Sequence, residues 1–433
     1  MNIVKIDSGV EWIGKIPSDW KIERLQWHLY EINEKNDPIK TTNILSLTNK
    51  LGVVPYSEKG NQGNVAKEKF DEYKVAYPDT IVANSMNILI GSVGYCNYFG
   101  CVSPVYYVFK NLKNSNLRYW DYVFQTSQFQ KELRKYANGI LEIRLRVSSD
   151  SILKRKVAVP SDIEQKKIVK ILDNKIYQID KLIANEEKQI ENFKQYKESL
   201  IIKVVTQGLN KDVIMKFSGV DWIGDIPSHW KISKIKYIGT TQNGISKSSE
   251  YFGHGFPFVS YSDVYRNYSL PSTIVGLIDS NEKEREAFSV KKGDIFFTRT
   301  SETIDEVGFS SVCEKTIEKA CFAGFLIRLR PFEVDRVINT SFAKYFFRSN
   351  LTRRFLVKEM NLVTRASLGQ ELLKSMYVLL PPMKEQRQIA DFLSLKCSII
   401  DNLITIKQSK IEKLQEYKKS LIYEYVTGKK EVI

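Results

Sequence analysis

The side chains of this sequence that are suited to binding a ligand are mainly hydrogen-bonding groups. Its five cysteines form no CxxC pair and its three histidines lie far apart, so we expect no disulfide framework, zinc ribbon or other metal site. Several polar, turn-rich segments instead combine Asn, Gln, Ser, Thr and Arg. Such side chains can read base edges in the major groove of DNA, while basic groups contact phosphates.

The candidate DNA-binding residues fall into two groups, one in each half of the chain. The first half supplies them from 49–64, from 83–87 and from one later arginine: Lys50, Asn61, Asn64, Asn84, Ser85, Asn87 and Arg144. The second half supplies them from 239–248, 260–267 and 297–302 and again from a later arginine: Gln242, Asn243, Ser246, Lys247, Tyr261, Ser262, Asp263, Arg266, Arg299, Thr300, Ser301 and Arg365.

Three enzymatic alternatives lack an essential residue pattern. Gly239 and Gly244 have phosphate-loop spacing, but Ile245 stands where the lysine must follow. A DNA amino-methyltransferase needs an Asn-Pro-Pro-Tyr type motif to hold the flipped base, and the nearest string, SPVY at 103–106, lacks its leading amide or acid. The spacing of acids and lysines around Asp294 favours no nuclease site. We therefore expect a chain without a catalytic residue.

The charge of the chain favours a polyanionic partner. With 65 Lys and Arg against 50 Asp and Glu, the formal net charge is +15, and clustered cations gain affinity by releasing counterions from a phosphate backbone. No apolar run reaches the length of a membrane helix, and the amino terminus has no secretion signal. We expect a cytoplasmic protein that does not contact a membrane.

The sequence contains an internal repeat. SGVEWIGKIPSDWKI at 8–22 returns as SGVDWIGDIPSHWKI at 218–232, with 12 of 15 positions identical. A second pair of related segments runs over 160–206 and 381–427, with 19 of 47 positions identical. The sequences between these blocks differ, although Asp79 aligns with Asp294, Gly94 with Gly308, Cys101 with Cys321 and Arg144 with Arg365. Two related folds with different surfaces explain this pattern.

The second repeated block predicts one long helix in each half. No Gly or Pro occurs between Ser161 and Gly208 or between Met383 and Gly428, and Ser161 with Glu164 has the spacing of a capping box. About 43 residues at about 1.5 Å each give a rod of roughly 65 Å.

Apolar residues at steps of three and four along both helices indicate a coiled-coil seam. Its members include Ile176, Ile179, Ile183, Ile190 and Phe193 in the first helix and Ile400, Ile404, Ile411 and Leu414 in the second, and the seam extends to Leu172, Leu200 and Val204 and to Leu393 and Leu421. The seam is interrupted at matching places by Glu186 and Lys407, and by Lys197 and Lys418. If the helices pack antiparallel, Glu186 and Lys407 meet near the middle as an ion pair.

The segments between the repeated blocks predict mixed α and β structure. β-branched and aromatic runs predict strands at 80–83, 102–110, 294–298 and 322–329, and helices are expected at 119–136 and 341–358. The predicted fold is α+β: two related mixed α/β domains separated by two long antiparallel helices, with a pseudo-two-fold repeat. The expected boundaries are 1–158 for the first domain, 159–208 for the first helix, 209–380 for a linker and the second domain, and 381–433 for the second helix and tail.

Two unequal heads held apart by a stiff two-helix spacer suit the recognition of two short DNA sequences separated by a fixed gap. One turn of B-DNA spans about 34 Å, so helices of this length can place two heads on separate half-sites. A scaffold whose heads bind proteins is the alternative, but the covalent duplication already supplies both helices in one chain.

The sequence resembles the DNA-specificity subunits of type I restriction-modification systems over essentially its whole length. The matching runs include SGVEWIGKIPSDWKI, NSMNILIGSVGYCNYFGCVSPVYYVF, KKGDIFFTRTSETIDEVGFSS and the PxxxEQxxI entries to both long helices. The resemblance implies that each head is a target-recognition domain for one half of a split, asymmetric site on double-stranded DNA.

The resemblance also implies partners that carry the chemistry. The long helices would dock two copies of an adenine-N6 modification subunit, which holds S-adenosylmethionine, and a translocase and nuclease subunit that uses ATP and Mg would complete the restriction enzyme. No cofactor is then expected in this chain.

Overall fold

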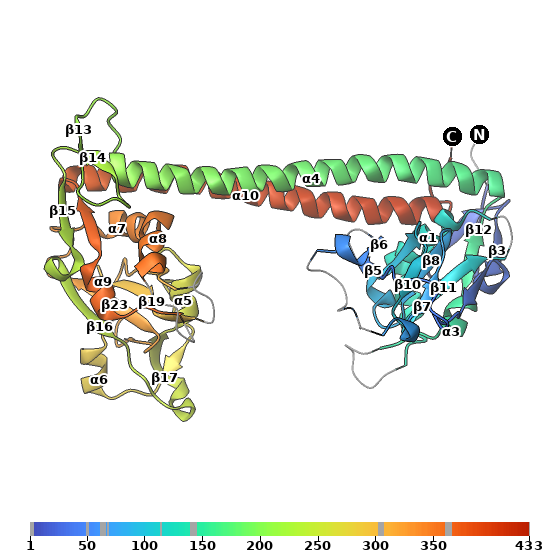
Figure 1. The fold of residues 1–433 in the computed structure, drawn as a ribbon, viewed down its shortest axis with the longest axis horizontal. Helices are drawn as coiled ribbons and strands as arrows, with labels where there is room; N and C mark the ends of the chain where they lie inside the picture. The colour runs from blue at the N-terminus through green and yellow to red at the C-terminus, as the bar shows by residue number, and fades with distance from the viewer. Residues whose placement is uncertain are drawn as a thin grey trace. The chain divides into compact units, whose positions relative to one another are not determined.

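The computed structural model describes residues 4–48, 52–60, 66, 69–112, 115–138, 145–301, 307–359 and 366–432. The chain divides into two units. The first unit consists of Met1–Glu187 together with Gln408–Ile433, and the second consists of Lys188–Lys407. Each unit contains one head, the beginning of one long helix and the end of the other (Figure 1). The domain boundaries expected at 158, 208 and 380 stay predictions.

The elements that lie in or begin in the first unit are β1 (Lys5–Asp7), β2 (Lys15–Pro17), β3 (Lys21–Arg24), β4 (Leu29–Ile32), β5 (Leu45–Thr48), β6 (Gly52–Pro55), β7 (Lys74–Ala76), β8 (Thr80–Asn84), β9 (Val93–Cys96), β10 (Gly100–Val102), β11 (Tyr106–Asn111), α1 (Leu117–Gln125), α2 (Ser127–Arg134), α3 (Ser149–Leu153), β12 (Lys156–Val159) and α4 (Asp162–Gln207). Short 3-10 turns, including η4 (Ile88–Ile90), connect several of them.

The second unit follows the same plan with β13 (Met215–Phe217), β14 (Asp225–Pro227), β15 (Lys231–Lys234), β16 (Gly239–Asn243), β17 (Phe252–Val259), α5 (Tyr261–Arg266), β18 (Leu277–Ile278), α6 (Glu282–Ala287), β19 (Ile295–Thr298), β20 (Thr300–Ser301), β21 (Ser310–Val312), β22 (Cys321–Phe322), β23 (Leu326–Pro331), α7 (Thr340–Arg348), α8 (Asn350–Glu359), β24 (Ala366–Ser367), α9 (Gln370–Ser375), β25 (Tyr377–Leu380) and α10 (Met383–Val426).

A four-stranded antiparallel sheet lies at the centre of each head, and the two sheets have the same topology. The strand order is β4-β11-β8-β9 in the first head and β16-β23-β19-β21 in the second. In the ladders Val82 pairs with Val108 and Phe297 with Ile327. The two heads are therefore copies of one fold, although their sequences have diverged.

Each central sheet is covered on both faces, because successive side chains of a strand point to opposite sides. In the first head Ile81 and Ala83 belong to the core that includes α1, while Val82 belongs to a second core with β5 and β6. In the second head Ile295 and Phe297 pack with α7, and Phe296 packs in the core formed with β17 and β22. Helices, central sheet and smaller sheets thus form three layers.

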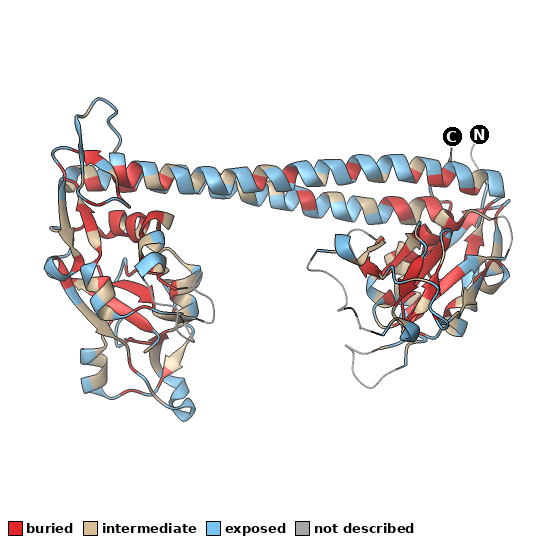
Figure 2. Ribbon diagram, viewed as in Figure 1, coloured by how far each residue is buried: buried red, intermediate tan, exposed pale blue. Residues whose placement is uncertain are grey.

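The long helices α4 and α10 pack together antiparallel, as the sequence predicts. Lys418 Nζ lies 2.7 Å from Asp180 Oδ1 in the first unit, and Lys197 Nζ lies 2.7 Å from Asp401 Oδ2 in the second. These two ion pairs occupy the same repeat positions. Buried positions recur along the facing sides of both helices (Figure 2), which is the burial pattern of a coiled-coil seam.

The duplicated SGV…WKI segment joins each head to the end of a long helix. Trp12, Ile13 and Trp20 share a core with the last turns of α10, and Val220, Ile223 and Trp230 share a core with the last turns of α4. The glycine after each helix lies against this segment. A Cβ on Gly428 would come within 2.3 Å of Pro17 Cδ, and one on Gly208 within 3.1 Å of a Trp230 ring carbon.

The glutamine of each EQ motif connects a helix entry to its head. Gln165 Oε1 accepts a hydrogen bond from the Asn116 amide at the start of α1 (3.1 Å), and its Nε2 donates to the Pro160 carbonyl. Gln386 repeats this with Asn339 at the start of α7 (2.7 Å) and with Pro381 (2.9 Å). Each side chain thus satisfies two backbone groups that no helix or strand bond serves.

The two predicted helices of the heads are each broken in two, which corrects the expectation of continuous helices over 119–136 and 341–358. The breaks fall at Thr126, between α1 and α2, and at Ser349, between α7 and α8. In both residues the hydroxyl donates to a carbonyl three positions earlier, Val123 (2.8 Å) or Phe346 (2.7 Å). Both have extended backbone, and this local hydrogen bonding competes with the helix.

The strand predictions need three corrections. The expected strand over 102–110 is interrupted between β10 and β11, and the one over 322–329 between β22 and β23. The segment 239–248, predicted as a polar loop, begins with strand β16, which pairs with β23. The alignment of Gly94 with Gly308 is also wrong. Ile81 and Ile295 face the equivalent cores, and Ile81 pairs with Tyr95 while Ile295 pairs with Val312, so the ladder position of Gly94 corresponds to Ser311. The same register aligns Asp79 with Gly293, so the alignment of Asp79 with Asp294 is off by one residue.

Candidate nucleic-acid interface

Two candidate segments occupy the same place in the two heads. The residues 85–87 follow β8, and the residues 299–301 follow β19. Each segment lies beside the residues that lead into a short helix much later in the sequence, α3 in the first head and α9 in the second. The Val147 amide donates to the Ser85 carbonyl (3.4 Å) ahead of α3, and the Leu368 amide donates to the Arg299 carbonyl (2.7 Å) ahead of α9. The candidate residues of the two heads thus lie at equivalent positions, although their sequences differ.

In the first head this segment forms a tight turn with one outward-facing amide. Asn84 and Ser85 are buried, and Asn84 Oδ1 accepts a hydrogen bond from the Met86 amide (3.0 Å). Asn87 is exposed. Sequence reasoning missed Arg146, an exposed arginine whose Nη2 lies 3.6 Å from Met86 Sδ. Of this group, Asn87 and Arg146 are the side chains free to meet a ligand, while Asn84 and Ser85 shape the turn.

In the second head the equivalent segment pairs with β24 as the short strand β20. Thr300 pairs with Ser367, and both Arg299 and Thr300 are half-buried. Within the described residues, the buried Nε of Arg299 has no hydrogen-bond acceptor. An arginine donor without a protein partner is suited to a ligand that brings its own acceptor.

The candidates of 260–267 lie on α5, a six-residue helix fixed at both ends. Ser260 and Asp263 form a capping box at its start, so the Asp263 carboxylate is engaged within the helix. At its end the Arg348 guanidinium donates to the Val264 carbonyl (2.9 Å) and to the Tyr265 carbonyl. Burial lowers the pKa of Arg348 to about 10, which leaves it charged at neutral pH.

This anchored helix presents polar side chains on its outer surface. Ser262 and Arg266 are exposed, and the Tyr261 ring, which is half-buried, stacks on that of Tyr265 with centroids 5.9 Å apart. A charged arginine and a hydroxyl on a rigid support can contact phosphate or a base edge.

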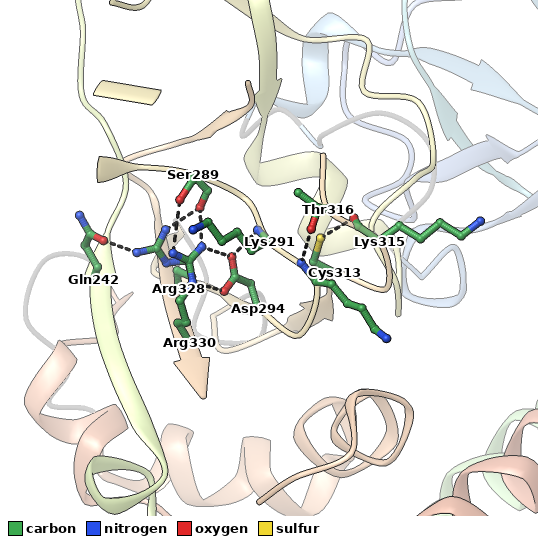
Figure 3. A network of polar contacts seen from close by, with 10 residues as sticks. Gln242, Ser289, Lys291, Asp294, Cys313, Lys315, Thr316, Arg328 and Arg330 are labelled. Atoms are coloured by element: carbon green, nitrogen blue, oxygen red, sulfur yellow. Dashed lines mark hydrogen bonds and ion pairs between the residues drawn. The ribbon is translucent and has the colours of Figure 1, made fainter. Parts of the chain in front are cut away.

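Gln242 is engaged inside the second head. Its Oε1 accepts a hydrogen bond from Arg328, whose guanidinium also donates to the Ser289 carbonyl (2.5 Å) (Figure 3). Arg330 next to it forms a bidentate pair with Asp294, with both distances 2.6 Å. Burial lowers the pKa of Arg328 to about 10. This network holds β16 against β23, so the structure gives Gln242 a role within the sheet.

The neighbours of Gln242 are partly engaged as well. Lys247 Nζ lies 2.7 Å from Glu284 Oε2 and donates to the Asp279 carbonyl (2.9 Å). Asn243 is half-buried at the end of β16, and Ser246 is exposed. Ser246 is therefore the candidate of this segment that solvent reaches most freely.

Several candidates lie outside the described residues: Lys50, Asn61, Asn64, Arg144, Arg365 and the side chain of Ser301.

The predicted spacer contacts are distributed over both units. In the seam Ile179, Ile190, Ile400 and Ile411 are buried, and Ile176, Ile183, Phe193, Ile404 and Leu414 are half-buried. Glu186 is buried and pairs with Lys410 (2.7 Å) in the first unit, while Lys407 donates to Gln189 Oε1 (2.5 Å) in the second. Glu186 and Lys407 belong to different units, so their direct pairing stays a prediction.

The titratable groups of the described residues form no cluster of three or more that could hold a metal ion. All five cysteines are free and buried. No helix in the described part of the chain is both long and apolar enough to cross a membrane.

Comparison with known proteins identifies the family. Residues 17–192 and 227–416 match the family model described as type I restriction modification DNA specificity domain. The type I restriction enzyme MjaVIII specificity subunit of Methanocaldococcus jannaschii is 24% identical over 426 residues, which cover 96% of this chain and 94% of that protein. The EcoKI specificity subunit of Escherichia coli is 24% identical over 54% of this chain and 48% of its own length.

Two solved structures share the fold. A chain from a study of complex assembly and conformational transition of the type I R-M system has a TM-score of 0.74 and 14% identity, covering 95% of this chain and 98% of its own. The HsdS subunit from Thermoanaerobacter tengcongensis has a TM-score of 0.52 and 13% identity, with the same coverage.

Two matched specificity domains and a packed pair of long helices define a DNA-specificity protein, and this chain belongs to the type I restriction-modification DNA specificity family. It is the specificity subunit of such a complex, and this subunit is the non-catalytic component.

Proposed function

We propose that the two heads read the two halves of a split, asymmetric site on double-stranded DNA. The observation that carries this proposal is that one sheet topology, β4-β11-β8-β9 and β16-β23-β19-β21, is present twice in one chain with different polar side chains after the equivalent strands β8 and β19. A duplicated fold with unlike contact residues suits two unlike sequences, because base-edge hydrogen bonds carry the sequence information.

The catalytic work belongs to partners in this proposal. Two copies of an adenine-N6 modification subunit, which bind S-adenosylmethionine, dock on the paired helices α4 and α10, and a translocase and nuclease subunit uses ATP and Mg. The repeat supports the two copies, because each unit contains the start of one long helix and the end of the other.

The proposal is tested by changing one head at a time. The wild-type chain, Asn87→Ala in the first head and Arg266→Ala in the second are each produced with the modification subunit in a host without adenine methylation, and the methylated sites are mapped by single-molecule sequencing. The wild type is expected to methylate one split, asymmetric motif. Each substitution should relax the sequence requirement of only one half, by about tenfold, since a good base contact is worth about 1–3 kcal/mol of discrimination. The loss of a contact to phosphate alone would instead slow methylation of the whole motif.

The contrary outcomes separate two errors. A wild type that methylates a continuous or palindromic motif contradicts the split-site function. A variant that methylates the original motif at the original rate removes only that residue from the interface. Arg336→Ala is the control for lost charge, because that exposed arginine pairs with Glu333 (3.5 Å) on the chain's own surface.

A further inference from the structure

The outer surface of α10 carries a line of exposed aliphatic residues. Leu395, Ile399, Leu403 and Ile406 have exposed fractions of 62%, 45%, 37% and 64%. Their spacing of four, four and three residues places them on one face of the helix, apart from the seam, where Ile400 and Ile404 lie. We name these four residues the α10 stripe; all of them belong to the second unit.

The repeat-related residues of α4, in the first unit, are mostly polar. Asn174, Gln178, Leu182 and Asn185 correspond to the four residues of the stripe at the offset of the helical repeat, and all are exposed. Only the leucine recurs, with an exposed fraction of 46% at Leu182. The same outer face is therefore apolar in one unit and polar in the other.

A second exposed residue recurs in both units. Tyr417 of α10 in the first unit and Tyr196 of α4 in the second are repeat-related, with exposed fractions of 49% and 57%. Each unit thus exposes one Leu and one Tyr at corresponding helix positions, Leu182 with Tyr417 and Leu403 with Tyr196. Two matching surfaces on one chain are suited to two copies of one partner.

We infer that an amphipathic helical segment of the modification subunit binds to each of these surfaces, and that the copy on the α10 stripe binds more tightly than the copy on the polar face of α4. This inference rests on the proposed function. A straight stripe on a helix is complemented by the apolar face of another helix.

The size and number of these surfaces favour this occupant. The stripe is a contiguous line of four aliphatic side chains, each at least 37% exposed, and the largest exposed apolar patch of a protein is often functional. The first copy gains from burying all four aliphatic side chains, whereas the second must cover two Asn and one Gln. A second copy of this chain is a poorer occupant, because self-association through two surfaces per chain leads to open-ended assemblies.

The test exchanges the two faces. One variant places the α4 residues on α10 (Leu395→Asn, Ile399→Gln and Ile406→Asn), and the reciprocal variant places the α10 residues on α4 (Asn174→Leu, Gln178→Ile and Asn185→Ile). Purified complexes with the modification subunit are diluted serially, and native mass spectrometry measures the 1:1 and 2:1 species. Ile214→Asn is the matched control, because it removes an aliphatic side chain with an exposed fraction of 79% that lies between α4 and β13, outside both long helices.

In the wild type the two dissociation constants should differ at least tenfold beyond the about fourfold statistical ratio of two equal sites. The polar variant should weaken the first step at least tenfold and make the two sites equal. The reciprocal variant should make them equal by tightening the second step. Circular dichroism checks that the helices remain intact in each variant.

Three results would count against these ideas, and they can be told apart. Equal affinities in the wild type, unchanged by either exchange, overturn the inference and leave the proposed function standing. No binding of the modification subunit to the wild type overturns the proposed function. Self-association of the isolated wild type that the polar exchange abolishes assigns the stripe to a second copy of this chain.

Discussion

At the scale of single residues, the structure separates side chains that face a ligand from those that hold the heads together. Asn87, Ser262 and Arg266 are exposed on supported segments. Gln242 and Lys247 are also polar side chains that could contact DNA, yet both bind partners from distant parts of the sequence. Gln242 accepts a hydrogen bond from Arg328, and Lys247 pairs with Glu284. The residue type indicates that a side chain could contact DNA, but the fold decides whether another part of the chain already occupies that side chain.

The motif glutamines lead to a prediction at this scale. Gln386→Ala should lower the free energy of unfolding by about 2–4 kcal/mol, because the Asn339 amide and the Pro381 carbonyl lose their partner in a buried place. Thermal and denaturant unfolding measure the loss, and hydrogen exchange should rise at the start of α7.

The control is Gln195→Ala, since that exposed glutamine bonds to Glu191 on the same helix (3.2 Å) and not to a head. It should change stability by less than about 0.5 kcal/mol. Equal effects of the two substitutions would show that Gln386 does not link helix and head.

At the scale of elements, the sequence predicts the long helices better than the heads. An apolar period without Gly or Pro over more than 40 positions is a local signal, and it locates α4 and α10 to within a few residues. The breaks at Thr126 and Ser349 depend on single hydroxyl groups inside apolar runs, so periodicity misses them. The polar sequence of β16 predicts a loop. It forms a strand because it pairs with β23 and because Gln242 accepts a hydrogen bond from Arg328, and neither contact is visible in the local sequence.

The glycines after the long helices give a prediction for this scale. Gly428→Ala should destabilise the protein by about 3 kcal/mol, because its φ of +65° disfavours a side chain and the new Cβ would overlap Pro17. Gly208→Ala should cost less, since the contact with Trp230 is longer.

Gly219→Ala is the control for backbone strain alone. Its φ is +78°, but no atom lies within 4 Å of the added carbon, so a loss of about 1–2 kcal/mol is expected. Denaturant unfolding of the three variants should give this order. A Gly428 variant no less stable than the Gly219 variant would contradict the packing described here.

At the scale of the whole molecule, the antiparallel helix pair is the element that the proposed split site depends on. The repeat-related ion pairs Lys418–Asp180 and Lys197–Asp401 define one register in both units. A change that preserves this register should alter the length of the pair without altering its packing.

Removing seven residues from each helix, 183–189 and 408–414, is such a change. Seven residues make two helical turns with a total length of about 10 Å. Three base pairs of B-DNA span about the same length, so the gap between the half-sites should shorten by about three base pairs. Sequencing of methylated adenines in cells that make the shortened chain measures the gap. An unchanged gap would show that the helices do not set it, and removing 183–189 alone should abolish assembly because the register is lost.

The attachment of residues 8–22 to the last turns of α10 has a consequence for biosynthesis. The second unit is one continuous stretch of the sequence, so its core can form while translation proceeds. Trp12, Ile13 and Trp20 must wait for Leu421, Tyr425 and Val426, which are synthesised after the whole second unit. The first head therefore completes its core only after the second head has been made, and a chain that stops before the last turns of α10 leaves the apolar side of residues 8–22 uncovered.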